Sequence, residues 1–248
     1  MATNIEKTKA LSEENPYVEK FREFFGSVYK KEIERLAESY PQKRSLEVDF
    51  KKLENYDFEL ADELLDKPDY MLEAAELAIA KMDIPTLTAE EFVPHVRFYN
   101  LPKDKTFMIK EIGSEHLGRL ICVEGVVRQL TEVMPKLKLA TWRCRRCGNS
   151  YTIAQETQQA KKPAFCEECR GRDFELIESE SEFVNYQKIQ IQEPLEKLHG
   201  SEQATYLDVH VSDDLVNRLA PGDKTKFVGI LRLYPGQGRK TLFGRYLE

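Results

Sequence analysis

The sequence of 248 residues lacks the features that mark several protein classes. No apolar run approaches the roughly 18 residues that a membrane-spanning helix needs, and residues 1–11 contain no apolar segment of a secretory signal. These absences predict a cytoplasmic protein without a membrane partner. With 41% hydrophobic and 32% charged residues, the chain is neither collagen-like nor wholly disordered, and its length suits two domains.

Motifs of the common enzyme classes are missing as well. The sequence has no GxSxG and no HExxH, and its four histidines are scattered without nucleophile–base spacing. The nearest approach to a nucleotide-binding loop is residues 236–241, where Arg239 occupies the place of the second glycine and a strand-like pattern follows. We therefore expect no catalytic residues in this chain.

Charge is unevenly distributed along the chain. The formal net charge is −6, but residues 1–93 carry 13 Lys and Arg against 22 Asp and Glu, whereas residues 94–248 carry 24 against 21. Residues 119–147 hold seven basic residues and two acidic ones. Because salt confines surface fields to about 10 Å, a basic face on an acidic protein can bind a polyanion. Composition alone favours the plainer interpretation, a solvated surface.

The first third of the sequence predicts a small helical bundle over residues 16–83. Pro16 can open a first helix, because proline suits the first turn, and apolar residues then recur at steps of three and four. Asp57 can cap a second helix and Pro68 can start a third. Between the first two helices, the alternating pattern of residues 45–50 indicates a short strand or extended segment.

The remaining residues predict short strands. Gly125 and Gly229 lie inside two of them and suggest bends or bulges where a barrel turns a corner. Five or six such strands fit a small closed barrel of the oligonucleotide-binding (OB) type better than a flat sheet. The expected strands are 95–99, 119–130, 133–142, 184–192, 205–211, 224–234 and 241–246.

Four of the five cysteines form two CxxC pairs. Cys144 and Cys147 are followed, after 18 residues, by Cys166 and Cys169. Two such pairs supply the four thiolates of a tetrahedral Zn²⁺ site, and because all four positions are filled the zinc would be structural. Two disulfides are the first alternative, disfavoured by the missing signal and by an unpaired Cys122. A redox-active CxxC is the second, although such motifs rarely occur as spaced pairs.

Cations that could follow the phosphates of DNA form three groups: one at the end of a barrel strand, one on the return strand, and one around a glycine-rich hairpin tip. For each cation alone, an ordinary solvated charge is the favoured interpretation. The groups taken together, on a barrel of this type, favour nucleic-acid binding. The candidates are Arg128, Lys136, Lys138, Arg232, Arg239 and Lys240.

The order of these parts resembles the N-terminal portion of an archaeal minichromosome maintenance (MCM) replicative DNA helicase. The resemblance extends from about residue 17 to residue 246, and the ordered set is more specific than any single motif. It rests on residues 44–50 (RSLEVDF), 117–128 (LGRLICVEGVVR), 189–196 (IQIQEPLE), 213–216 (DDLV), 221–223 (PGD) and 228–231 (VGIL).

The resemblance implies a homo-oligomer, a hexamer or double hexamer, that encircles single- or double-stranded DNA without sequence preference, associates with the nucleoid and works with other replication factors. ATP and Mg²⁺ would be bound only by an ATPase domain beyond Glu248. A loop of residues 190–205, with Gln192, Glu193 and Glu202, would act between subunits. A plain connection between strands is the alternative for that loop.

Taken together, the sequence predicts an α+β chain: an acidic helical bundle over residues 1–93 and an OB-fold barrel over residues 94–248. The barrel would carry a zinc-binding insertion at 141–178 and a projecting β-hairpin at 229–247. We interpret the chain as the DNA-binding and ring-assembly region of a hexameric helicase.

Two other functions stay open. The first is a stand-alone zinc-containing OB-fold protein that binds single-stranded DNA. It would need aromatic stacking positions, for which Phe107, Trp142 and Tyr186 are candidates that core packing explains at least as well. The second is a protein–protein scaffold, which would have no affinity for polyanions.

Overall fold

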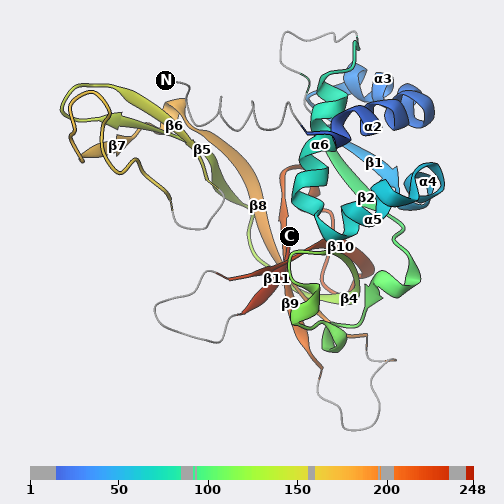
Figure 1. Ribbon diagram of the computed structural model, residues 1–248. Helices are drawn as coiled ribbons and strands as arrows, with labels where there is room; N and C mark the ends of the chain where they lie inside the picture. The colour runs from blue at the N-terminus through green and yellow to red at the C-terminus, as the bar shows by residue number, and fades with distance from the viewer. Residues whose placement is uncertain are drawn as a thin grey trace.

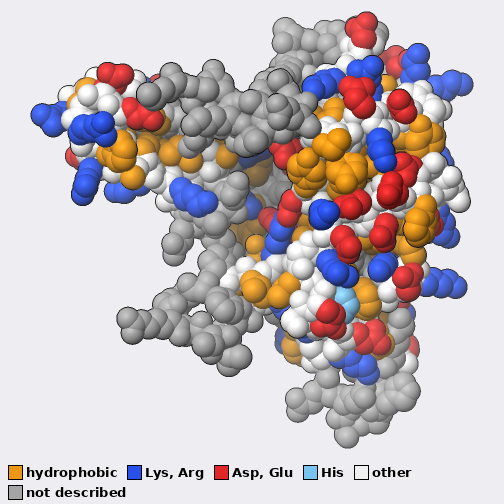
Figure 2. All heavy atoms as spheres, in the orientation of Figure 1, with side chains coloured by type: hydrophobic (Ala, Val, Ile, Leu, Met, Phe, Trp, Pro, Cys, Tyr) orange, Lys and Arg blue, Asp and Glu red, His pale blue; other side chains and the backbone are white. Residues whose placement is uncertain are grey.

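A computed structural model describes residues 15–84, 92, 94–155, 160–194, 196, 204–234 and 244–248. Three parts are visible in Figure 1: a helical unit, a strand barrel, and a long arm of paired strands that leads away from the barrel. In the same orientation, Figure 2 shows Asp and Glu side chains interspersed with Lys and Arg over the helical unit. The fold predicted from the sequence, helices followed by an OB-type barrel with a cysteine-bearing insertion, is confirmed. None of the described helices is long and apolar enough to cross a membrane.

The helical unit follows the start signals in the sequence. Asp57 accepts a hydrogen bond from the backbone N–H of Leu60 at 3.0 Å, as an N-cap does, and Pro68 is the first residue of the last helix. The predicted first helix runs on to residue 39 but contains one π-helical turn. In chain order the helical segments are α2 (Tyr17–Phe24), the π-helical η1 (Phe25–Tyr29), α3 (Lys30–Ser39), α4 (Phe50–Tyr56), α5 (Phe58–Asp66) and α6 (Pro68–Ala80).

Helix α4 was not predicted. The strand expected over residues 45–50 ends one residue early, at β1 (Ser45–Asp49), because the Asp49 carboxylate accepts the N–H of Lys51 at 3.1 Å and caps α4. Strand β2 (His95–Tyr99), expected among the barrel strands, pairs in parallel with β1. This pairing attaches β2 to the helical unit.

Five of the strands that the structure describes close the barrel. Their order is β4–β10–β11–β9–β8, and β8 pairs back with β4. Inward-facing side chains of these strands form one apolar core, which includes Val123, Ile189 and Leu231. The strands are β4 (Leu120–Leu130), β8 (Glu182–Gln192), β9 (Tyr206–Ser212), β10 (Lys224–Leu233) and β11 (Arg245–Leu247), with β3 (Thr106–Phe107) added beside β4.

The two strand glycines allow close approach of the neighbouring strand and do not mark bulges. A Cβ on Gly125 would lie 2.9 Å from Cδ1 of Ile191, and one on Gly229 would lie 2.6 Å from the carbonyl oxygen of Glu248. The register shift in β4 falls instead between Val127 and Gln129. The prediction of bulges at these glycines was therefore wrong, because the pairing of β4 with β10 runs through both without a shift. A bend at either glycine stays a prediction, and what both supply is space.

The arm is built around strand β5. Strand β5 (Met134–Cys144) pairs with β8, and beyond the barrel it pairs with β6 (Ser150–Ala154) and β7 (Phe174–Leu176). The cysteines lie where these strands are connected, so the prediction that the metal-binding segment is an insertion between barrel strands is confirmed. Short 3₁₀ segments complete the fold: η2 (Lys103–Lys105), η3 (Ile109–Glu111), η4 (Ser114–His116), η5 (Glu178–Glu180) and η7 (Asp213–Leu215).

Barrel strands β4 and β10 separate two apolar cores. Leu120 and Cys122 of β4 and Ile230 of β10 pack into the core of the helical unit. Their neighbours Ile121 and Leu231 point the opposite way, into the barrel core. Both follow from the alternation of side chains along a strand.

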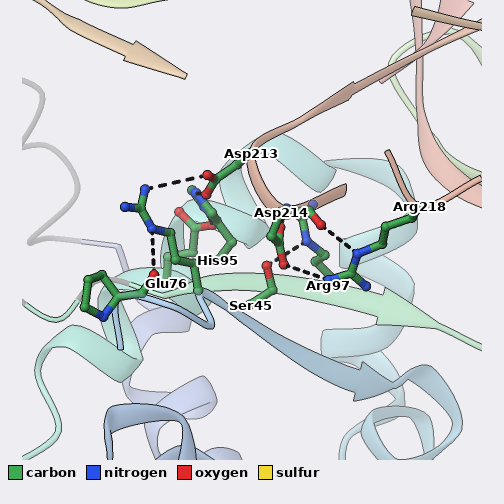
Figure 3. Close-up of polar contacts among 9 residues, drawn as sticks. Ser45, Glu76, His95, Arg97, Asp213, Asp214 and Arg218 are labelled. Carbon is green, nitrogen blue, oxygen red and sulfur yellow. Dashed lines mark hydrogen bonds and ion pairs between the residues drawn. The ribbon is translucent and has the colours of Figure 1, made fainter. Parts of the chain in front are cut away.

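A polar network joins the helical unit to the barrel on the η7 side (Figure 3). Asp213 lies 3.5 Å from His95 Nε2 and 3.6 Å from Arg44, while Asp214 pairs with Arg97 and, at 3.5 Å, with Arg218. Burial opposes ionisation of Asp214, but the Ser45 hydroxyl and then Arg97 outweigh it and lower the pKa of its carboxyl group. Asp214 is thus held as an anion between Arg97 of β2 and Arg218, which follows η7.

Candidate metal centre and nucleic-acid interface

The four predicted cysteines meet at the far end of the arm. Their sulfur atoms all lie within 4.8 Å of one another, with Cys144 and Cys169 3.6 Å apart and Cys147 and Cys166 3.4 Å apart. Four thiolates about 2.3 Å from a tetrahedral Zn²⁺ ion are about 3.8 Å from each other. The four cysteines can therefore hold a metal ion, and none of them forms a disulfide.

Each CxxC pair is shaped by a tight turn. The N–H of Gly148 donates to the carbonyl of Cys144 at 2.8 Å, and the N–H of Arg170 donates to that of Cys166 at 2.9 Å. Both donor residues have a left-handed backbone, with φ of 81° at Gly148 and 58° at Arg170. Glycine adopts this conformation without a Cβ penalty, which explains the first of the two.

Tyr151 of β6 supports the sulfur cluster from outside. Its hydroxyl lies 3.3 Å from Sγ of Cys166 and accepts the N–H of Glu167 and the side-chain amide of Asn149, each at 2.9 Å. The Tyr151 hydroxyl, followed by the N–H of Cys169, lowers the pKa of Cys166 to about 6. This contact favours the thiolate that a metal requires.

The same cluster does not favour four thiolates without a cation. The N–H of Asn149 lowers the pKa of Cys147. The contact of Cys147 with Cys166, followed by burial and by the contacts of Cys147 with the other two sulfur atoms, outweighs this and raises the pKa of Cys147 to about 12. A bound cation would remove this conflict, because it stabilises all four negative charges together. The sulfur set thus fits a metal ion better than it fits free thiols.

Three predicted cation positions lie on β4 and β5, next to β8. Arg128 is exposed, donates to the side-chain oxygen of Gln190 at 3.1 Å and lies 4.6 Å over the ring of Tyr206. Lys136 lies 5.5 Å over the ring of Tyr186. Lys138 is exposed, at the register shift in β5.

These contacts align the cations along one face of β8. Residues 186, 188 and 190 alternate with buried ones, so their side chains share the outer face at steps of about 7 Å. Three cations therefore form a row along β8, which we call the β8 cation row. They are Lys136, which contacts Tyr186, then Lys188, and then Arg128, which contacts Gln190. Within the chain, Lys188 pairs with Asp208 at 2.8 Å and Lys136 approaches Glu248 at 3.8 Å.

A cavity of about 540 Å³ lies beside this row. It is bounded by the start of β5 and by barrel strands β8 to β11, and Figure 1 shows the arm leaving the barrel at this point. Met134 and Leu233, which are 46% and 42% exposed, supply apolar surface. Its other lining residues include Lys136, Lys188, Tyr186, His210 and Tyr246.

Lys188 was missed by sequence reasoning. The candidate cations were those that lie close together in the sequence, whereas Lys188 stands alone between polar and apolar residues. The alternation Tyr186, Lys188, Gln190 against buried Ile189 and Ile191 could have placed it on the outer face. Its proximity to Lys136 depends on the pairing of β5 with β8, which the sequence does not show.

Arg232 has an intramolecular role in this structure. Its guanidinium binds both carboxylate oxygens of Asp69 in α6 and lies 3.2 Å from Glu248. The contact to Asp69, the largest contribution, raises the pKa of Arg232. Arg239 and Lys240, the other two hairpin candidates, lie outside the described residues.

The loop residues expected between subunits are placed in part. Gln192 ends β8 and faces Val126 and Tyr206. Glu193 is 1% exposed, and its carboxylate accepts the N–H of Lys110 at 2.8 Å. Within this chain Glu193 therefore fixes the start of the loop to the barrel, while Glu202 lies outside the described residues.

The aromatic residues considered for base stacking are dispersed. Phe107 packs against the ring of His116 with centroids 4.3 Å apart, and the Trp142 indole donates to the carbonyl of Lys161 in the arm. Only Tyr186 of the three lines the cavity. The other two have packing roles in the chain.

The fold places the chain in the class of OB-fold proteins whose barrel is joined to a helical unit and carries a four-cysteine arm. Comparison with known proteins narrows this class. The sequence profile of the MCM N-terminal domain matches residues 16–103, and that of the MCM OB domain matches residues 108–235. The chain therefore belongs to the MCM family.

Individual relatives agree with this assignment. The minichromosome maintenance protein MCM of Saccharolobus solfataricus is 26% identical over 88% of this chain, and the DNA replication licensing factor MCM4 of Drosophila melanogaster is 25% identical over 82%. The crystal structure of the N-terminal domain of an archaeal MCM superimposes with a TM-score of 0.76 at 32% identity, covering 93% of this chain and 94% of that one. The chain spans 34% and 23%, respectively, of the two full-length relatives.

Proposed function

We propose that this chain is the DNA-binding and ring-assembly part of an ATP-driven replicative helicase. It would form hexamers or double hexamers around single- or double-stranded DNA, next to the nucleoid in the cytoplasm and together with other replication factors. ATP and Mg²⁺ would be bound by a separate ATPase domain, and we assign no catalytic step to the residues of this chain. Membership of the MCM family supports the proposal.

The observation that carries the proposal is the β8 cation row. Arg128, Lys188 and Lys136 follow one strand at regular steps, beside a cavity with exposed apolar surface. Cations repeated along a groove neutralise successive phosphates and read no bases, so binding would be independent of sequence. One subunit offers few cations, and useful affinity would need several subunits acting on one DNA molecule.

The metal in the arm would be a structural Zn²⁺ ion. Cys144, Cys147, Cys166 and Cys169 fill all four tetrahedral positions, so no place remains for a reactive water. Among the described residues, the apolar cluster beneath them contains one buried ring, Phe174, with Trp142 and Tyr151 packed against it. Such a small cluster gives the metal the main stabilising role, and a rigid arm could serve contacts between rings.

The experiment is binding of a labelled oligonucleotide across a series of salt concentrations, with oligomer mass measured in the same samples. Duplex affinity should fall steeply with salt, with a slope of about −0.9 for each phosphate contact. Arg128→Gln and Lys136→Gln should each reduce the magnitude of the slope by about that amount per subunit engaged.

Lys67→Gln is the matched control. Lys67 pairs with Glu63 at 2.8 Å in the helical unit, so this variant removes one exposed cation that is not a member of the row. The DNA-binding proposal would be rejected by affinity that does not respond to salt, or by equal losses in the Lys67 and Lys136 variants. Binding that appears only in ring-sized species would support the ring-assembly part.

A further inference from the structure

The two lysines of the β8 cation row each face a carboxylate of the same chain. Nζ of Lys188 lies 2.8 Å from Oδ2 of Asp208 in β9. Nζ of Lys136 lies 3.8 Å from Oε1 of Glu248, which follows β11. The charge of both lysines is therefore already balanced inside the chain, and the proposed function assigns no role to the two carboxylates.

Arg128, the third cation of the row, differs from the lysines. Its guanidinium donates to the neutral side chain of Gln190 and lies over the ring of Tyr206, and within the described ranges it forms no ion pair. A phosphate can therefore bind Arg128 without displacing an anion. At either lysine, a phosphate must replace a carboxylate.

The carboxylate of Asp208 is held in place by more than Lys188. Its Oδ2 also accepts the hydroxyl of Tyr234 at 2.8 Å, and the side-chain amide of Gln190 lies 3.5 Å from its Oδ1. Burial opposes ionisation, but Lys188, followed by the Tyr234 hydroxyl, outweighs it and lowers the pKa of the Asp208 carboxyl group. If Lys188 turned toward DNA, the other two contacts would keep Asp208 beside the row.

The carboxylate of Glu248 is anchored in the same way. The backbone N–H and carbonyl of Glu248 pair with those of Ile230 at 2.9 and 2.7 Å. Its Oε2 lies 3.2 Å from Nε of Arg232, and the terminal nitrogens of that guanidinium bind Asp69 of α6. Arg232 thus holds in place an anion that competes for Lys136.

The lysines are the mobile partners of these two ion pairs. A lysine carries its charge on a flexible four-carbon stem, whereas the carboxylates of Asp208 and Glu248 are fixed by other contacts. The side chains of Lys188 and Lys136 are 37% and 32% exposed, and ion pairs near the surface contribute little to stability. Both lysines can therefore exchange a carboxylate for a phosphate, and the carboxylate stays nearby as a competitor.

We propose that Asp208 and Glu248 are built-in counter-ions of the β8 cation row. They compete with DNA phosphates for Lys188 and Lys136 and keep the affinity of the row below that of three free cations. Return of a carboxylate to its lysine also assists release of a phosphate. The inference rests on the proposed DNA-binding function and deepens it, because it names the residues that limit affinity.

The two central variants are Glu248→Gln and Asp208→Asn. Each removes one negative charge and keeps the size of the side chain. Each is also combined with loss of the lysine that it faces, as E248Q/K136Q and D208N/K188Q, and compared with the single lysine variant. This comparison separates the release of a lysine from the general effect of one negative charge fewer.

Glu182→Gln is the matched control. Glu182 is the first residue of β8, is exposed, and forms no ion pair with any residue that the structure describes. It lies four residues before Tyr186, about 13 Å along the strand, so salt screens it from the row. The control loses the same charge from the same strand without releasing a cation.

The readout is the affinity for a labelled duplex oligonucleotide at one fixed, low salt concentration. Glu248→Gln and Asp208→Asn should each tighten binding by up to about fivefold per engaged subunit, as expected from one exposed ion pair. Glu182→Gln should bind nearly as the wild type does. Once the facing lysine is absent, the gain from either central variant should fall to that of Glu182→Gln.

Two results would overturn the inference while leaving the DNA-binding proposal in place. One is a gain from Glu248→Gln or Asp208→Asn no larger than that from Glu182→Gln. The other is an equal gain with and without the facing lysine. Absence of DNA binding by the wild-type protein at low salt would instead reject both proposals. Melting temperatures measured on the same samples identify a variant that fails to fold, and the remaining carboxylate variant then decides.

Discussion

Removal of the metal should unfold the arm and leave the rest of the chain folded. The sulfur atoms are spaced as tetrahedral zinc requires, and structural zinc contributes about 10–16 kcal/mol to the folding of small domains. The burial of apolar side chains in the arm supplies much less free energy. A buried ring such as Phe174 contributes at most about 1.5–3 kcal/mol, and Trp142 and Tyr151 are only partly buried. The arm therefore cannot keep its fold on apolar burial alone.

The chain contains its own reporter for this experiment. Trp142 is the single tryptophan, and it packs against the cysteine cluster with its indole N–H bonded to Lys161 at 3.0 Å. Chelation, or Cys166→Ser, should shift its fluorescence to longer wavelength as water reaches the ring. The far-UV circular dichroism of the helices should stay unchanged, because every described α-helix lies in the other unit.

Two controls define what would refute this reasoning. Cys122→Ser changes a buried cysteine of β4 that is outside the sulfur cluster, and it should leave one bound metal per chain. Metal content is measured by mass spectrometry before and after chelation. Unchanged Trp142 emission in protein shown to be free of metal would refute the structural role. Loss of the helical signal in the same transition would refute the independence of the arm.

Two further predictions concern the barrel. Gly125→Ala should destabilise the chain by about 1–3 kcal/mol, because the new Cβ would lie 2.9 Å from Ile191, and the comparison in urea unfolding is Gly26→Ala, where a Cβ meets nothing within 4 Å. Folding lowers the pKa of His210 from 6.5 to about 4, so the unfolded chain binds a proton there more readily than the folded chain does. The contribution of neutral His210 to stability is therefore complete above pH 6.5 and is lost as the pH falls toward 4. The loss is roughly 3 kcal/mol at most, and urea midpoints measured across this range should vary less in His210→Gln; an equal pH dependence in the variant would contradict the assignment.

Local signals predicted the elements that local chemistry forms. Asp57 and Pro68 mark helix starts because a cap and a first-turn proline act within four residues. The CxxC pairs indicate a metal site because each turn brings two sulfurs together without help from the rest of the fold. Helix α4 was missed because the apolar pattern of residues 45–50 continues through Phe50, although the Asp49 cap that ends the strand is itself a local signal.

Contacts between distant residues were beyond sequence reasoning. Arg232 appears in the sequence as a cation beside a glycine-rich tip, and only the folded chain brings it to Asp69, 163 residues away. The β8 cation row likewise depends on two strand pairings, β4 with β8 and β5 with β8. Strand β2 was grouped with the barrel because its pattern is that of any strand, and its parallel partner β1 lies about fifty residues earlier.

The alternation of β4 and β10 between two cores has a consequence for how this chain can evolve. Neighbouring residues such as Leu120 and Ile121 face opposite cores, so deleting or inserting one residue in β4 would exchange the contents of both at once. Insertions and deletions should therefore accumulate in the loops between strands and should not occur within β4 or β10. For the same reason the helical unit and the barrel should open as one cooperative block in hydrogen exchange, with the arm exchanging separately.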